Sequence, residues 1–235
     1  MADFNDIGIP RQLDWPRVRK LLTIGVFGAL LHLTGDLILG WGVEDESLTG
    51  LFRTLSAYTA TRDGGILASA LLGLLGMTLE GLSLFGVYRL MAERSPRDAH
   101  RYRSGILGYL IFGACGFHVP TCALVFLGKQ GLPEETLARF ALYFLLPATA
   151  LFWVFFLLLA VTQIAAFAKG RTPYPRWCWV FSPLVGGLAA QALGFLGNLP
   201  LLNAIACAWL AIGCLWMFGG LLGLAKSAER RSNAL

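Results

Sequence analysis

The chain has 235 residues, of which 56% are hydrophobic and only 14% are charged, and its mean hydropathy is +0.64. Soluble domains carry about 25% charged residues, so this composition excludes an ordinary soluble protein and is typical of a membrane protein. The formal charge of +5 comes from basic residues in short segments between apolar runs. This placement is typical of membrane topology signals and disfavours nucleic-acid binding.

Six apolar runs are long enough to cross a bilayer as helices, which predicts an all-α, polytopic transmembrane bundle. The predicted spans cover about residues 21–41, 64–91, 104–128, 138–168, 178–198 and 200–226. Together they form one transmembrane domain over residues 21–226, between an N-terminal arm at 1–20 and a tail at 227–235. No Ala-x-Ala cleavage site follows the first run, so we expect it to stay in place as a spanning helix.

Six spans would place both ends of the chain on the same side of the membrane. Lys and Arg number 15 in the segments on that side and four in the segments on the opposite side. Because basic residues are retained in cytoplasmic loops, this asymmetry predicts that both termini are cytoplasmic. On the opposite side, residues 47–58 are expected to form a short interfacial helix.

The first run, LLTIGVFGALLHLTGDLILGW, carries His32 and Asp36 near its middle. Side chains at positions i and i+4 share one helix face, so both can point into the protein interior rather than into lipid. Ionisable residues inside a membrane are rare and usually mark a pathway, a bound ion or a catalytic centre. We therefore expect the functional site to involve this pair.

Two later spans carry ionisable residues at a compatible depth. Glu80 lies near the centre of the second span, and His118 lies near the middle of the third, two residues before a kinking proline, Pro120. We expect a cavity in the outer half of the bundle, where these groups converge. Its secondary polar lining is expected to come from Gln191, Asn198 and Asn203.

Three functional hypotheses fit this cluster. In the first, His32, Asp36, Glu80 and His118 bind a metal such as zinc or iron, which activates water against a lipid-like substrate. In a metal-free form of the same enzyme, a buried carboxylate with a raised pKa and a histidine would act as general acid and base, so Asp36 and Glu80 are the candidate catalytic residues. The expected partners are then the lipid bilayer and a lipid-like or small-molecule ligand.

In the second hypothesis, the same side chains form a proton relay coupled to the movement of a small solute. In the third, His32 and His118 ligate a haem; this ranks lowest because the two carboxylates would then have no role. The alternative to all three is a structural membrane subunit without catalysis, in which the cluster only joins helices by hydrogen bonds. Gln191, Asn198 and Asn203 would then join or cap helices.

Several motifs occur together along the chain. The first span ends in a GDxxxG pattern (Gly35, Asp36, Gly40), the second is glycine-rich with a central acid, the third holds a histidine, and a TxYPRW loop (Thr172–Trp177) precedes a Ser-Pro helix start. This combination resembles a family of uncharacterised six-helix bacterial membrane proteins, a domain of unknown function, over most of the chain. The resemblance implies a six-helix fold and a bacterial plasma membrane, and it implies no activity.

Overall fold

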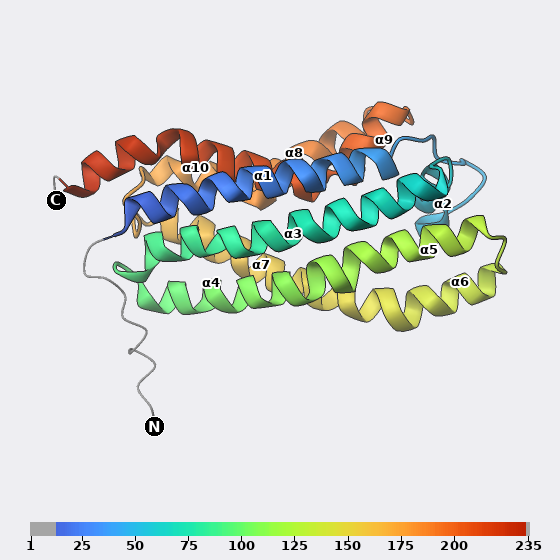
Figure 1. Cartoon of the computed structure of the whole chain (residues 1–235), viewed down its shortest axis with the longest axis horizontal. Helices are drawn as coiled ribbons and strands as arrows, with labels where there is room; N and C mark the ends of the chain where they lie inside the picture. Colours follow the sequence, from blue (N-terminus) through green and yellow to red (C-terminus); the bar gives the residue numbers. More distant parts are fainter. Residues whose placement is uncertain (1–12, 234–235) are drawn as a thin grey trace, which may run out of the picture.

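The computed structural model describes residues 13–233, and every regular element in that range is a helix. The long helices lie side by side along one axis (Figure 1). The first three are α1 (Trp15–Leu39), the short α2 (Gly50–Tyr58) and α3 (Asp63–Ala92). Helix α2 confirms the short helix expected in the first loop.

Two long segments follow, each built from three consecutive helical pieces. The first consists of α4 (Pro96–Tyr109), η2 (Leu110–His118) and α5 (Val119–Lys129). The second consists of α6 (Glu134–Phe140), η3 (Ala141–Leu145) and α7 (Leu146–Ala168). The described chain ends with η4 (Arg176–Val180), α8 (Pro183–Gly194), α9 (Pro200–Cys207) and α10 (Trp209–Asn233).

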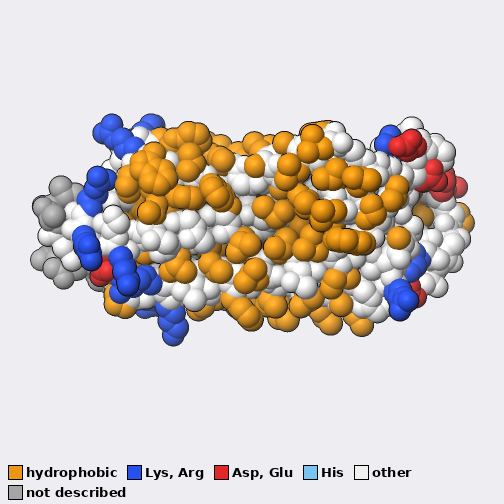
Figure 2. Space-filling model, turned by 90° about the horizontal axis from the view of Figure 1, so that it is seen from above, with side chains coloured by type: hydrophobic (Ala, Val, Ile, Leu, Met, Phe, Trp, Pro, Cys, Tyr) orange, Lys and Arg blue, Asp and Glu red, His pale blue; other side chains and the backbone are white. Residues whose placement is uncertain are grey.

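Five helical segments within residues 13–233 are long and apolar enough to cross a membrane. They are Trp15–Leu39, Asp63–Ala92, Pro96–Lys129, Glu134–Ala168 and Trp209–Asn233. Hydrophobic side chains cover the middle of the face seen in Figure 2, while most of the visible Lys and Arg gather at one end and most of the visible Asp and Glu lie at the other. This distribution is that of an integral, multi-pass membrane protein in a lipid bilayer.

The fifth predicted span, residues 178–198, differs from the expectation. Its α-helix, α8, has 12 residues, which is about 18 Å at 1.5 Å per residue and shorter than the roughly 20 residues of a full crossing. A 3₁₀ turn precedes α8, and Gly197, with a φ of 155°, follows it. The sixth predicted span, 200–226, is divided at Ala208 into α9 and α10.

The two ends of the chain also extend the helices beyond the predicted spans. Helix α1 begins at Trp15 because Asp14 caps it, with its side chain accepting a hydrogen bond from the backbone N–H of Arg17 at 3.0 Å. Helix α10 continues to Asn233, into the predicted tail. Residues 1–12 of the predicted arm and residues 234–235 of the tail lie outside the described residues.

Both π-helical segments, η2 and η3, end two residues before a proline, Pro120 and Pro147 respectively. Proline lacks an N–H, so the carbonyl one turn earlier loses its usual partner, and a local π register is one way to satisfy it. Such π segments are frequent at functional sites. Here η2 ends at His118, one of the predicted site residues.

Helices α1 and α3 pack closely because glycines line their contact. A β-carbon at Gly76 would lie 2.6 Å from the backbone nitrogen of His32, and one at Gly28 would lie 2.9 Å from the carbonyl oxygen of Gly76. These glycines let the two backbones approach closely, as small residues do in membrane helix pairs. The close packing places the side chains of His32 and Glu80 within reach of each other.

Candidate functional site

The structure brings His32, Asp36, Glu80 and His118 together in the interior of the bundle. His32 and Asp36 lie one turn apart on α1, Glu80 lies on α3, and His118 ends η2. All four side chains are buried, with at most 5% of any residue exposed. The two imidazole rings are 5.5 Å apart between centroids and nearly perpendicular, at 89°.

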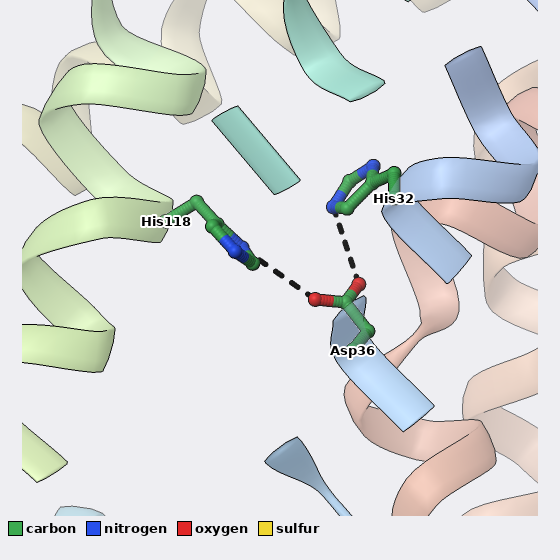
Figure 3. Close-up of side chains that lie close together, drawn as sticks. All are labelled: His32, Asp36 and His118. Atoms are coloured by element: carbon green, nitrogen blue, oxygen red, sulfur yellow. Dashed lines mark ion pairs between the residues drawn. The ribbon is translucent and has the colours of Figure 1, made fainter. Parts of the chain in front are cut away.

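Asp36 lies between the two histidines. One of its oxygens, Oδ2, is 3.2 Å from Nε2 of His32, and the other, Oδ1, is 3.5 Å from Nδ1 of His118. Figure 3 shows this arrangement, in which each carboxylate oxygen is directed toward a different ring. Asp36 is therefore the central group of the cluster.

Glu80 contacts the opposite side of the His32 ring. Its carboxylate oxygens lie 3.2 and 3.3 Å from Nδ1 of His32, and one of them also accepts a hydrogen bond from the hydroxyl of Tyr109. An ionised carboxylate only accepts hydrogen bonds, so Nδ1 of His32 carries the proton. The remaining nitrogen, Nε2, faces the carboxylate of Asp36, so it donates when the ring is protonated and presents a lone pair when the ring is neutral.

The ring of His118 is oriented by the backbone of α3. Its Nε2 lies 3.0 Å from the carbonyl oxygen of Ser69, which can only accept, so Nε2 carries the proton. In the neutral ring, Nδ1 of His118 therefore presents a lone pair toward Asp36. Three groups that could bind a metal, from His32, Asp36 and His118, offer ligand atoms that lie within 4.8 Å of one another.

A cavity of about 600 Å³ lies next to this cluster and is lined by His32, Asp36 and His118, but not by Glu80. Its apolar walls include Leu39, Phe117, Trp209 and Leu210. Its polar rim includes Glu44, Glu46 and Arg53, from the loop and short helix that follow α1. The volume falls within the range of small-molecule sites, which is about 300–1,000 Å³.

The three expected secondary polar residues also line the cavity, but their hydrogen bonds go mainly to the backbone. Asn198 donates to the carbonyl oxygen of Glu44 at 2.8 Å and accepts from its N–H at 2.8 Å. Asn203 donates to the carbonyl oxygen of Gly42 at 2.9 Å, and Gln191 donates to that of Ala206 at 2.9 Å. Asn198 and Asn203 therefore bind the loop after α1 to the α8–α9 corner, and Gln191 joins α8 to α9.

Sequence reasoning missed three residues that shape the cluster: Tyr109, Ser69 and Gly73. Tyr109 is nine residues from His118, and Ser69 contributes only its carbonyl oxygen, so neither carries a spacing signal. Gly73 is one of many glycines in the second span. Their roles follow from how α3 packs against α1 and η2.

No curated protein and no solved structure is similar enough to this chain to count as a match. The model of a family of unknown function matches residues 4–228, nearly the whole chain, which confirms the resemblance carried by the sequence motifs. The chain therefore belongs to the family of unknown function DUF6796.

Proposed function

We propose that the chain crosses a bacterial plasma membrane six times, with its arm at 1–20 and its tail at 227–235 in the cytoplasm and residues 21–226 as the membrane domain. The charge distribution supports this orientation, because 15 of the 19 basic residues fall in segments assigned to the end where α1 begins and α10 ends. The short α8, together with η4 and residues 195–199, would make the fifth crossing. A fluorescent reporter fused after Leu235 should fold on the cytoplasmic side.

We infer that this membrane protein is an enzyme acting on a lipid-like substrate. One observation carries the inference: four ionisable side chains from three helical elements converge beside a single cavity. An enzyme needs such convergence, whereas a transporter needs groups strung along a path with access to both sides. The full burial of Leu22, Val87 and Tyr102, on the basic side of the cluster, supports access to the site from one side only.

The chemistry available at this point is proton transfer to and from water. Asp36 faces the cavity and is placed to accept a proton from a water molecule whose oxygen attacks the substrate. The same proton would then pass to the leaving group, so that one water is consumed for each bond cleaved. Glu80 does not line the cavity; it contacts Nδ1 of His32, on the far side of the ring, and orients that ring.

The test uses full-length protein in nanodiscs that contain a lipid extract of the producing bacterium. Lipid mass spectrometry over time should show loss of one lipid class and the appearance of its cleavage products. The variant Asp36→Asn should lower this rate by about 100-fold or more, because general acid–base groups contribute about 10²–10⁴. The variant Glu135→Gln, at an exposed acid, is the matched control. An unchanged lipid profile with the wild type, or full activity in Asp36→Asn, contradicts the proposal.

One observation favours a proton-coupled transporter as the second candidate. Asp36, His32, Glu80 and Tyr109 form a continuous row of hydrogen-bonding titratable groups that leads away from the cavity. Proteoliposomes with an imposed pH gradient distinguish this function from the enzyme. Proton flux that needs Asp36 and Glu80, without any change in the lipids, would replace the enzyme with the transporter.

A further inference from the structure

We propose that Nε2 of His32, Nδ1 of His118 and the carboxylate of Asp36 bind one divalent transition-metal ion, such as Zn²⁺ or Fe²⁺. The inference rests on the proposed function: one carboxylate oxygen of Asp36 would bind the ion, which would activate the attacking water, and the other oxygen would accept the proton of that water. It also changes the expected ligand set, since Glu80 becomes an outer partner of His32 and not a ligand. Two histidines and one carboxylate are a ligand set that suits zinc and non-haem iron sites with open positions.

The positions of the protons support a cation at the centre of the cluster. Glu80 accepts the Nδ1 proton of His32, and the carbonyl oxygen of Ser69 accepts the Nε2 proton of His118. In neutral rings, the two remaining nitrogens are lone-pair groups, and both are directed at Asp36, which is itself an acceptor. Such an arrangement of three acceptors requires either added protons or a positive ion between them.

Charge favours the ion over added protons. Protonating His32 alone lets it donate to both Asp36 and Glu80, but Nδ1 of His118 then still faces an oxygen of Asp36 as one acceptor against another. Protonating both rings would place two positive charges with ring centroids 5.5 Å apart in the buried interior, where their repulsion is strong. A divalent ion compensates the carboxylates of Asp36 and Glu80 while both rings stay neutral. Neutral imidazole is also the form in which histidine binds metals.

The spacing of the ligand atoms fits a metal of this size. Two atoms that each lie about 2.1 Å from a tetrahedral ion are about 3.4 Å apart. The observed separations are 3.2 Å between Nε2 of His32 and Oδ2 of Asp36, and 3.5 Å between Nδ1 of His118 and Oδ1 of Asp36. These separations involve different oxygens of Asp36, and one ligand atom from each of the three residues lies within 4.8 Å of the other two, so the side chains would move closer together to surround one ion.

The surroundings supply the two other features of a catalytic metal site. Metal-binding histidines almost always donate their second N–H to a carboxylate or a backbone carbonyl, and Glu80 and Ser69 provide one acceptor of each kind. Tyr109 in turn donates to Glu80 and holds its carboxylate in place. The cavity lies on the side of the three ligands, which leaves room for water and substrate at the remaining positions.

The experiment uses the full chain purified in detergent with a streptavidin-binding tag, because a polyhistidine tag would itself bind metal. Elemental analysis of the protein as isolated, and after chelation and reloading with Zn²⁺, should give one ion per chain. The variants His32→Ala and His118→Ala should each lose this ion. His100→Ala removes the third histidine of the chain, which is exposed on α4, and should retain it.

Two further measurements protect the test against misfolded variants. Co²⁺ loaded into the wild type should give visible absorption bands that shift in Glu80→Gln, because the outer partner of His32 has changed. Glu80→Gln should still bind one Zn²⁺ but about 10–100 times more weakly, as outer-partner variants do. The proposal is overturned if the wild-type protein holds clearly less than one ion per chain after reloading. It is also overturned if His32→Ala and His118→Ala both still hold one ion per chain.

The results for the metal and for the function can be told apart. Full lipid turnover by chelated protein that binds no Zn²⁺ would contradict the metal site and leave the enzyme standing. One Zn²⁺ per chain without any lipid turnover would support the metal site and contradict the enzyme.

Discussion

The imidazole of His118 lies directly against Gly73 on α3. A β-carbon at Gly73 would come within 2.0 Å of Nε2 of His118, which is closer than any real contact. The same nitrogen donates to the carbonyl oxygen of Ser69, one turn earlier on α3. The absence of a side chain at position 73 therefore determines where the His118 ring lies, and with it the distance to Asp36.

The first prediction concerns this contact. Gly73→Ala should push the ring of His118 away from α3, lower the free energy of unfolding by about 1–3 kcal/mol, and weaken Zn²⁺ binding at least tenfold. Gly219→Ala on α10 is the control, because a β-carbon there meets no atom of the described residues within 4 Å. SDS denaturation in micelles measures the free energy of unfolding of each variant, and Zn²⁺ titration measures its metal affinity. Equal metal affinity in Gly73→Ala and wild type would show that the ring is not held by this contact.

The second prediction concerns the hydroxyl of Tyr109, which is fully buried and donates to Glu80. Tyr109→Phe leaves the carboxylate without this donor and should lower the free energy of unfolding by about 1.5–3 kcal/mol, the usual range for a hydrogen bond to a charged group. Tyr143→Phe is the matched control, since Tyr143 is 68% exposed. A loss of similar size in both variants would mean that the Tyr109–Glu80 bond contributes nothing specific.

The third prediction concerns the two hydrogen bonds by which Asn198, in the α8–α9 corner, holds the main chain of Glu44 at the rim of the cavity. Asn198→Ala removes both hydrogen bonds to the main chain of Glu44, so the loop should open more often. A local loss of about 1–2 kcal/mol corresponds to a 5–30-fold increase in the open population. A glutamate-specific protease should cut at Glu44 or Glu46 faster by that factor, whereas Gln130→Ala, at an exposed position, should leave the rate unchanged. Cleavage at the wild-type rate in Asn198→Ala would show that these hydrogen bonds do not hold the loop in place.

The fourth prediction concerns Asp98, which lies at the basic end of the bundle, before the predicted span 104–128. Burial by itself raises the pKa of Asp98, but hydrogen bonds from Ser95 and Arg171 and the nearby positive charges outweigh it and hold the pKa below its ordinary value of 3.8. The Arg171 Nη1 to Asp98 Oδ2 distance is 2.5 Å. A pKa lowered by folding stabilises the protein above the ordinary value, and this stabilisation is lost as the pH falls through the folded-state pKa.

Asp98→Asn should therefore lower the midpoint of thermal unfolding at neutral pH, by an amount equivalent to about 1 kcal/mol or less, because Arg171 is partly exposed. The difference from wild type should shrink as the pH is lowered below 3.8. Thermal scans of both proteins in detergent across this range are the measurement. If the difference in unfolding midpoint between the two proteins stays constant with pH, the lower stability of Asp98→Asn comes from packing and not from the charge of Asp98.

Much of the site could be predicted because its signals are local or are set by depth. His32 and Asp36 share a helix face through their i, i+4 spacing, and Glu80 and His118 fall at the same depth because helices rise by about 1.5 Å per residue. Neither rule gives the rotation of a helix about its axis. The sequence therefore placed Glu80 among the ligands, whereas in the structure it reaches the far nitrogen of His32 and does not line the cavity.

By itself, the sequence determined that this is an all-helical membrane protein, which end carries the basic residues, and which ionisable residues lie in the apolar interior. These properties depend on composition and on periodicity along one chain. Only the tertiary structure decided which nitrogen of each histidine faces Asp36, that Tyr109 and Ser69 fix the two rings, and that α8 is short. These properties depend on the close approach of α1, α3 and η2, which glycines such as Gly73 and Gly76 permit, and that approach is a relation between helices rather than a property of any one of them.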